Sequence, residues 1–220
     1  MAWTAPTNVA TGDVLSATRY NNEVVGNALA GGPIYATEAL RDAAITAPFE
    51  GQRAYITGST ETTAVAGASG TTAIPSGIQT IYNGAAWVTV TEVGAYTATA
   101  GTIAATAAYV TTLTGDATAL SVTLRTGTSA LITFSSIATH SVAGQGITNS
   151  VSVGGASAVV ASVISQASHV FAVAGGSSPI IRSIALTGLV AGVNVFTLNY
   201  FCGATTATMT LRSLTVKGIA

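Results

Sequence analysis

Only 7% of the 220 residues are charged and the formal net charge is −1, whereas charged residues make up about a quarter of an average globular protein. The lack of a basic surplus argues against a nucleic-acid partner. Hydrophobic residues reach 49% but are mostly Ala and Val, and Thr, Ser and Gly dominate the remainder. This composition favours a rigid β-scaffold whose faces are covered by neighbouring copies of the chain.

The few charges are unevenly distributed. Residues 1–94 carry seven acidic and three basic side chains. The rest of the chain has five charged residues, namely Asp116, Arg125, Arg182, Arg212 and Lys217. This asymmetry predicts a boundary near residue 95, and we expect three regions: 1–32, 33–94 and 95–220. The length is sufficient for one good-sized domain with smaller attachments.

The first region, residues 1–32, predicts a helix. Ser16 can cap it, and Gly31, Gly32 and Pro33 end it. Its apolar stripe at helical spacing consists of Ala17, Tyr20, Val24 and Ala28. A short amphipathic helix has little to pack against within its own segment, so we interpret residues 1–32 as a docking element.

Trp3, Tyr20 and Val24 are the expected docking residues of this segment, because they are apolar and Trp3 has no evident partner within the chain. The N-terminus lacks the basic start and apolar run of a signal peptide. No stretch is apolar for long enough to span a bilayer as a helix, so we expect no membrane insertion.

The second region, residues 33–94, is expected to be a small connector built on a β-hairpin. A helical turn is predicted over 36–44, a strand over 53–57 and a flexible low-complexity loop over 62–77. Strands over 79–82 and 87–90 flank Asn83-Gly84, a pair typical of hairpin turns. We expect Tyr82 and Trp87 to form a stabilising cross-strand pair.

The third region, residues 95–220, is predicted to be an antiparallel β-sandwich of jelly-roll type, because short alternating strands recur with turns every 8–12 residues. The expected strands are 109–113, 120–124, 130–134, 151–153, 158–164, 169–171, 180–186, 193–202 and 207–216. We expect 151–153 to form a hairpin with 158–164, and 193–202 to pair with 207–216. The overall fold class is therefore mainly β.

Cys202 is the only cysteine, so an intrachain disulfide is excluded. It alternates with Leu198 and Tyr200 on one face of an expected strand, which predicts a packed core thiol.

Three parts of the chain resemble the minor tail, tail-fibre and related virion proteins of tailed bacteriophages and prophages. They are residues 1–6 (MAWTAP) with 16–22 (SATRYNN) and 25–27 (VGN), residues 50–53 (EGQR) leading to 81–87 (IYNGAAW), and residues 186–200 with 211–216 (LRSLTV). The resemblance implies homotrimers attached to a virion, and it implies no catalytic residues. A coiled-coil or collagen-like stalk is absent, which favours a compact spike over a long fibre.

Catalytic and metal-binding chemistry is poorly supported by the sequence. A Ser141, His140 and Asp116 set can be drawn, but no motif supports it. The β-rich region has a single carboxylate, whereas glycoside cleavage needs a pair. His140 and His169 are not at metal-ligand spacing. We therefore expect no enzyme activity, no metal and no cofactor.

The combined prediction is a structural virion protein, assembled in the host cytoplasm. It is expected to be a homotrimer that docks on other virion proteins through residues 1–32. Its head domain would face a host surface glycan or protein, although no residue points to a particular receptor. The alternatives are a capsid decoration or head-fibre protein, a carbohydrate-binding module, and a depolymerase, which the lack of paired acids disfavours.

Overall fold

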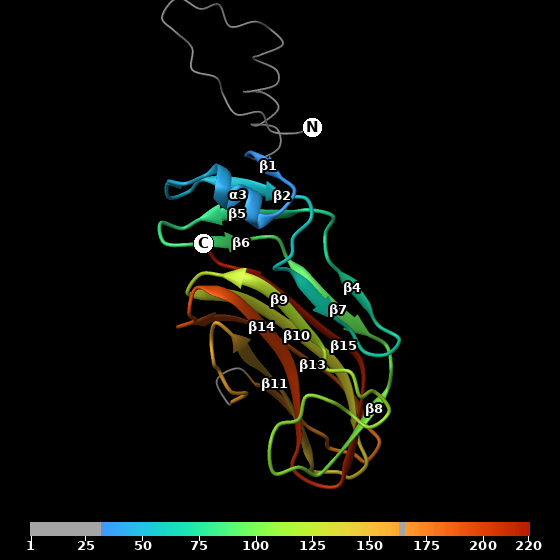
Figure 1. Ribbon diagram of the computed structural model, residues 1–220. Coiled ribbons are helices and arrows are strands. Elements are labelled where there is room, and N and C mark those ends of the chain that lie inside the picture. Colours follow the sequence, from blue (N-terminus) through green and yellow to red (C-terminus); the bar gives the residue numbers. More distant parts are fainter. Residues whose placement is uncertain (1–31, 163–165) are drawn as a thin grey trace, which may run out of the picture.

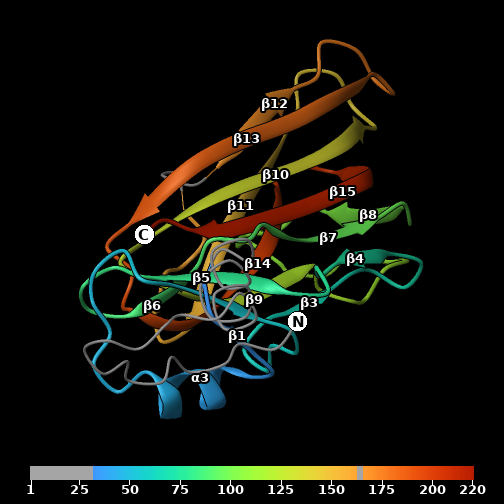
Figure 2. The same ribbon diagram turned by 90° about the horizontal axis from the view of Figure 1, so that it is seen from above.

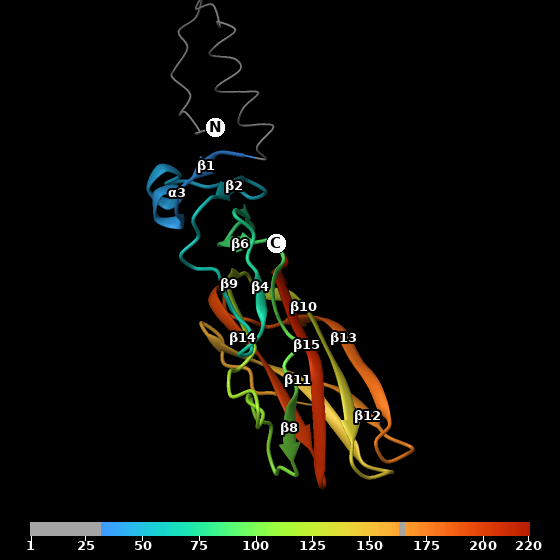
Figure 3. The same cartoon turned by 90° about the vertical axis from the view of Figure 1, so that its right-hand side faces the viewer.

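The computed structural model describes residues 32–162 and 166–220, which form a small sheet with one helix stacked on a larger β-sandwich (Figure 1). The described chain starts in the small sheet, and its C-terminus returns to the junction between the two parts (Figure 3). The helix expected within residues 1–32 lies outside the described residues.

The small sheet has the strand order β1-β2-β5-β6. Its elements are β1 (Ile34–Tyr35), α3 (Glu38–Ala44), β2 (Arg53–Ile56), β5 (Ile78–Tyr82) and β6 (Trp87–Thr89). The predicted helical turn, strand and hairpin are thus confirmed. Thr37 caps α3 because its Oγ1 accepts a hydrogen bond from the Leu40 N–H at 3.3 Å. In the part of the chain that the structure describes, no helix is long and apolar enough to cross a bilayer.

Arg41 fastens helix α3 to this sheet. Its guanidinium carbon lies 4.6 Å from the centroid of the Trp87 ring, and its side chain is almost completely buried. Trp87 in turn meets Tyr82 edge-on, with ring centroids 5.6 Å apart, in the predicted cross-strand pair. The two aromatic rings therefore serve the packing of the small sheet itself.

The sandwich consists of a six-stranded and a five-stranded sheet, both antiparallel. The six-stranded sheet has the order β13-β10-β15-β7-β4, with β8 also beside β15, and Figure 2 shows β13, β10 and β15 side by side. Its strands are β4 (Thr71–Ala73), β7 (Val93–Thr97), β8 (Gly101–Ala104), β10 (Ser129–His140), β13 (Ser177–Thr187) and β15 (Thr206–Gly218). The five-stranded sheet, in the order β12-β11-β14-β9-β3, contains β3 (Thr63–Val65), β9 (Ser121–Thr126), β11 (Gly146–Gly155), β12 (Ala167–Val170) and β14 (Gly192–Cys202).

The chain passes repeatedly from one sheet to the other between β9 and β15, as in jelly-roll folds. Along β10 every second residue is buried, because strand side chains alternate between core and outer face. Phe134 from one sheet and Phe196 and Leu198 from the other lie in the common core. The predicted mainly-β fold with an antiparallel sandwich is confirmed. The predicted core position of Cys202 is also confirmed, since the residue is fully buried.

The prediction that the last two strands pair with each other is wrong. β14 pairs with β11 and β9, whereas β15 pairs with β10, β7 and β8. The connection through Gly203, Ala204 and Thr205 carries the chain across the core, and Thr205 has a φ of 52°. Each strand has a long apolar face, so the two bury more apolar surface facing each other across the core than as edge-to-edge neighbours.

The prediction of a flexible loop over 62–77 is also wrong. β3 pairs with β9 of one sheet and β4 pairs with β7 of the other, so the segment forms an arch that joins the two sheets at one side of the sandwich. The small residues of the arch let its backbone approach the core closely. β7 itself runs across the expected boundary between residues 94 and 95.

Two other predicted strands are absent from the described residues. Segment 109–113 makes only isolated bridges, among them Val110 with Tyr200. Residues 158–162 make a single bridge, from Val159 to Val153, and β11 pairs instead with β12. Residues 163–165 lie outside the described part. Both segments have the apolar alternation of a strand, but each meets its neighbour at isolated positions: Val110 beside β14 beyond its pairing with β9, and Val159 beside β11 beyond its pairing with β12.

A β-bulge in β15 places Arg212 inside the sandwich. Ser135 pairs with Ser213 but Ile137 pairs with Thr210, so β15 has one extra residue here. The irregular residue of the bulge is Leu211, which has a φ of 47° and a side chain that is 42% exposed. Alternation continued from Ala207 and Met209 would have turned Leu211 inward and Arg212 outward, whereas after the bulge the buried positions are Arg212, Leu214 and Val216. The bulge therefore exchanges a buried leucine for a buried arginine.

The small sheet and the segment that follows β2 contact the sandwich closely, among other positions at Arg125, Gly127 and Gly218. Arg125 of β9 makes a two-pronged ion pair with Glu61, with its Nη2 2.5 Å from Oε1 and its Nε 2.6 Å from Oε2. Gly218 at the end of β15 lies against β6, where an added Cβ would come within 2.7 Å of the Thr89 carbonyl oxygen. Such close backbone contact explains the glycine at this position.

Candidate functional site

The outer side of the six-stranded sheet is a broad surface almost free of charge, here called the open face. It consists of every second residue of β10, β13 and β15 together with Tyr96 of β7. Among these strands, Lys217 is the one charged residue on the outer side, because Arg182 and Arg212 occupy inward positions. The remaining residues are mostly Ser and Thr, with Leu131, Ile137 and Ile181 between them.

Hydroxyl groups on the open face bond to one another across the strands. Thr133 Oγ1 lies 2.8 Å from Ser183 Oγ, and Ser135 Oγ lies 2.7 Å from Ser213 Oγ. Each pair satisfies part of its hydrogen-bonding capacity within the sheet. Covering the face would therefore leave fewer unpaired polar groups than its hydroxyl content suggests.

A shallow hollow of about 130 Å³ lies at one side of the open face. Its lining includes Thr72, Gly94, Tyr96, Ser213 and Thr215. Gly94 has no side chain to fill the space between its neighbours, and Tyr96, 39% exposed, stands beside it. An aromatic ring next to hydroxyl groups is a chemical arrangement suited to a sugar ring or to an apolar side chain of a partner.

The outer side of the five-stranded sheet is partly covered by the chain's own loops. Ser150 of β11 bonds through its hydroxyl to the carbonyl of Ser162. Phe201 of β14 packs against Tyr109 with ring centroids 5.6 Å apart, and the Tyr109 hydroxyl donates to Gln166 Oε1 at 2.9 Å. The two outer surfaces of the sandwich thus differ, since loops cover much of one and leave the other open.

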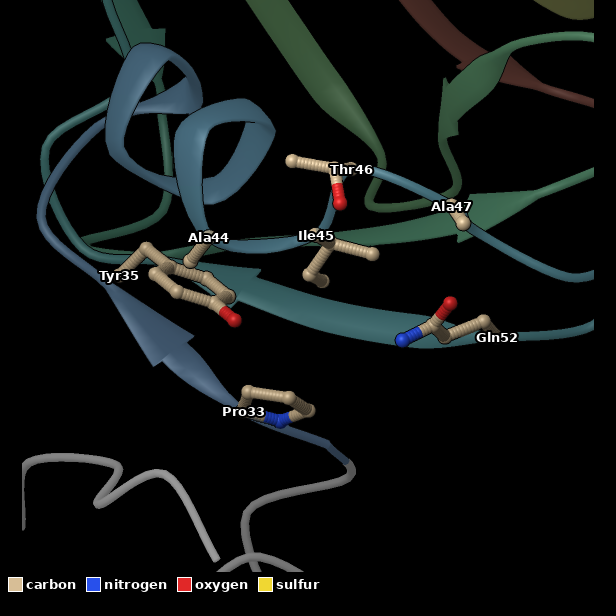
Figure 4. Close-up of a pocket in the computed structure, with 7 residues that line it drawn as sticks. All are labelled: Pro33, Tyr35, Ala44, Ile45, Thr46, Ala47 and Gln52. Carbon is tan, nitrogen blue, oxygen red and sulfur yellow. The ribbon is translucent and has the colours of Figure 1, made fainter.

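A second hollow, of about 360 Å³, lies in the small sheet, where the described chain begins (Figure 4). Figure 4 shows Pro33 and Tyr35 from β1 and its approach facing Ile45 and Gln52. Burial raises the pKa of the Tyr35 hydroxyl, an effect that the positive charge of Arg41 opposes. The hollow is mainly apolar and contains no cluster of ionisable groups, so it offers packing space without an evident reaction centre.

The predicted docking residues Trp3, Tyr20 and Val24 lie outside the described residues. The structure therefore leaves their docking role as a prediction.

Ser141, His140 and Asp116 do not form a hydrogen-bonded catalytic set. His140 is buried, with Nδ1 3.1 Å from the Val142 carbonyl oxygen and Nε2 3.0 Å from that of Ala204. The Ser141 hydroxyl donates to the Thr206 carbonyl at 2.8 Å. Each of the three groups is thus held by other partners. The other histidine, His169, packs edge-on against Phe171.

Asp116 instead forms a buried ion pair that sequence reasoning missed. Its Oδ2 lies 2.5 Å from Arg212 Nη2, and neither side chain is exposed. Burial alone raises the pKa of Asp116, but hydrogen bonds from Ala68 and Arg212 and the Arg212 charge outweigh it, so that the net pKa is lowered. Asp116 therefore stays ionised. A lone acid in a nearly charge-free region was the sequence signal for such a buried partner.

Arg212 connects both sheets through the same network. Its Nη1 donates to the Tyr200 hydroxyl at 3.1 Å, and its Nη2 donates to the Thr99 carbonyl at 3.1 Å. These contacts join β15, β14 and the segment after β7. The arrangement is suited to holding the sandwich together, because the two charged groups are paired with each other and out of reach of solvent. The Arg212 Nε, also buried, makes no hydrogen bond.

Metal ligands are not clustered in the described part of the chain: it contains no group of three or more His, Cys, Asp or Glu side chains that could hold an ion. Cys202 is buried, with Sγ 3.4 Å from His140 Nε2, and burial raises the pKa of its thiol. A neutral buried thiol is a poor nucleophile.

No protein-family model and no curated protein matches this chain. Among solved structures it is similar to an Eiger TNF from S. frugiperda, with 12% identity over 58% of this chain and 92% of that chain and a TM-score of 0.38. A structure of the infectious bursal disease virus Gx strain matches with 16% identity over 61% of this chain and 36% of that chain, with a TM-score of 0.40. The CBM22-1 and GH10 modules of Clostridium thermocellum xylanase 10B, complexed with xylohexaose, match with 13% identity over 56% and 26% of the two chains and a TM-score of 0.31. Similarities at this level say nothing about what this chain binds or does.

Proposed function

We propose that the protein is a non-enzymatic structural subunit of a tailed-phage virion, a homotrimeric fibre- or spike-type protein. The observation that carries the proposal is the open face, a sheet surface with Lys217 as its one outward charge. A freely dissolved monomer would leave this uncharged surface in water, whereas an assembled subunit would bury it. That the assembly is a phage virion is inferred from the resemblance of three parts of the sequence to virion proteins.

The arrangement of the two parts supports attachment by one end. The small sheet, which follows residues 1–31 in the chain, lies at one pole, and the loops of the sandwich lie at the other (Figure 3). A subunit docked through residues 1–32 would hold its sandwich away from the particle, where it could meet a host surface glycan or protein.

Particle incorporation tests the proposal. Deletion of residues 1–32 should leave the sandwich folded, as judged by circular dichroism, but should abolish incorporation of the protein into purified phage particles. Incorporation of the shortened chain at the full-length level would contradict the docking role. Electron microscopy of intact particles would distinguish a tail position from a capsid-decoration or head-fibre position.

A carbohydrate-binding module is the second candidate function, favoured by Tyr96 beside the hydroxyl-lined hollow of about 130 Å³. Aromatic faces and hydroxyl groups together suit sugar recognition. A glycan array probed with the full chain would show selective binding that Tyr96→Ala removes. Absence of binding across the array would eliminate this candidate. Polysaccharide degradation by the purified chain would contradict the non-enzymatic assignment.

A further inference from the structure

We infer that the open face of the six-stranded sheet is the surface through which copies of this chain associate. The occupant of the face is thus a second copy of the same chain. This inference rests on the homotrimer of the proposed function and specifies which surface builds it.

Charge favours a second copy as the occupant. A partner with a charged surface would have to desolvate its charges against a face that offers only Lys217 in return. The chain itself has very few charges between residues 95 and 220. Another copy offers an equally charge-poor surface, and Lys217, next to the last residue of β15, is the one charge that each copy would have to keep in solvent.

Several polar groups of the open face already have hydrogen-bond partners within the sheet, so they can be buried at a lower cost. The Thr133–Ser183 and Ser135–Ser213 hydroxyl pairs are already hydrogen-bonded at 2.8 and 2.7 Å. Ile181 is 65% exposed on the edge strand β13 and supplies apolar area that gains from being covered. Because these hydroxyls are already paired, burying the open face costs less desolvation free energy. Covering Ile181 adds the favourable free energy of burying apolar surface.

The size of the face suits a stable interface. With strands about 4.8 Å apart and about 3.3 Å per residue, the open face covers roughly 700 Å². Stable protein interfaces bury about 800 Å² on each partner. The open face thus comes close to the area of one standard interface, and in a trimer, where each copy contacts two neighbours, surface beside the face would take part as well.

The other side of the sandwich is a poorer candidate. Its centre is covered by the loop that bonds Ser150 and by the packing of Tyr109 on Phe201. It also carries Arg125, which is engaged with Glu61. A partner would have to displace these contacts, whereas the open face needs no rearrangement.

A matched pair of arginine substitutions tests the assignment in the full chain. Thr133 of β10 and Thr123 of β9 are both half-buried, outward threonines on the second strand from the edge of their sheets. Thr133→Arg should weaken self-association about 100-fold, because it buries an unpaired charge in the interface. Thr123→Arg should leave the wild-type mass unchanged in multi-angle light scattering. Both variants should retain the β-sheet circular dichroism spectrum.

Cysteine labelling gives a second measurement that does not depend on dissociation. Cys202 is fully buried, so maleimide should report mainly on an introduced thiol. Thr133→Cys should react about tenfold more slowly than Thr123→Cys at concentrations where the chain is associated, since reactivity follows access. Equal labelling rates would overturn the inference.

The outcomes separate the two proposals. A wild-type trimer that survives Thr133→Arg but dissociates with Thr123→Arg would overturn the open face as the interface and leave the trimer standing. A wild-type monomer at micromolar concentration would overturn both the interface and the trimer. A monomer that binds glycans on this face, with binding lost in Tyr96→Ala, would replace the second copy by a carbohydrate.

Discussion

The guanidinium of Arg212 and the carboxylate of Asp116 meet inside the sandwich, with 2.5 Å between Nη2 and Oδ2 and neither side chain exposed to solvent. Arg212 comes from the bulge of β15, and Asp116 also accepts the Ala68 N–H of the arch at 3.1 Å. The pair therefore ties β15 of the six-stranded sheet to the segment that contains Asp116 and to the turn of the arch between β3 and β4. Its expected role is structural, and it can be tested directly.

Arg212→Met should lower the free energy of unfolding by about 3–5 kcal/mol, because it leaves the Asp116 carboxylate buried without its partner. The Tyr200 hydroxyl loses its donor in the same variant. Urea unfolding followed by circular dichroism measures the loss. Arg125→Met is the matched control, since its ion pair with Glu61 is partly exposed and should contribute about 1 kcal/mol or less. Equal losses in the two variants would contradict the structural role of the buried pair.

The stability of the protein should fall in acid because of Asp116 and Glu38. The pKa of Asp116 is lowered by the amide and Arg212 contacts despite burial. That of Glu38 is lowered despite burial by hydrogen bonds from Ser59 and Thr60. A carboxyl whose pKa is lowered on folding binds fewer protons in the folded state, so its contribution is present above the unfolded value of about 4 and is lost as pH falls through the folded value.

Urea unfolding at pH values from 7 down to 3 measures this dependence. Asp116→Asn should be less stable than wild type at pH 7 and should show a shallower decline below about pH 4. A variant with the wild-type slope would show that Asp116 does not contribute to the acid sensitivity.

Local patterns in the sequence were sufficient to predict where most strands lie, but not which strands pair with each other. The alternation over 120–124 and 130–134 and the hairpin around Asn83-Gly84 appear as β9, part of β10 and the β5–β6 pair. β14 and β15 lie in different sheets because each buries its apolar face across the core. The short loop between them is compatible with a hairpin as well, so it does not predict which sheet each strand joins. The Asp116–Arg212 pair joins residues 96 positions apart, so no local spacing could reveal it.

The same limit applies to the candidate site. The scarcity of charge was visible in the composition and predicted faces covered by neighbours. Which face stays open depends on the loops near Ser150 and Tyr109, whose placement on the five-stranded sheet follows from the tertiary fold.

Leu211→Gly should leave stability unchanged or raise it by up to about 1 kcal/mol. Leu211 has a φ of 47°, a conformation that costs about 1–2 kcal/mol for a residue with a Cβ, and glycine removes most of this cost while adding freedom to the unfolded chain. Its neighbour Thr210 is the control, because it lies in regular pairing with Ile137. Thr210→Gly should lower the unfolding free energy by about 1 kcal/mol. The reverse order of the two variants in urea unfolding would contradict a strained bulge.

Gly67→Ala should destabilise the sandwich by about 1–3 kcal/mol, because an added Cβ has no room there. It would collide with the Asp116 carboxylate and would lie 2.7 Å from Thr97 Oγ1, and Asp116 cannot move away without losing Arg212. Gly154→Ala is the matched control, since a Cβ there meets nothing within 4 Å. Thermal unfolding should show a lowered Tm for the first variant and a nearly unchanged Tm for the second. Similar Tm values would mean that the arch can shift to accommodate the added Cβ. The close approach of the arch to the buried ion pair would then not explain the small residues over 62–77.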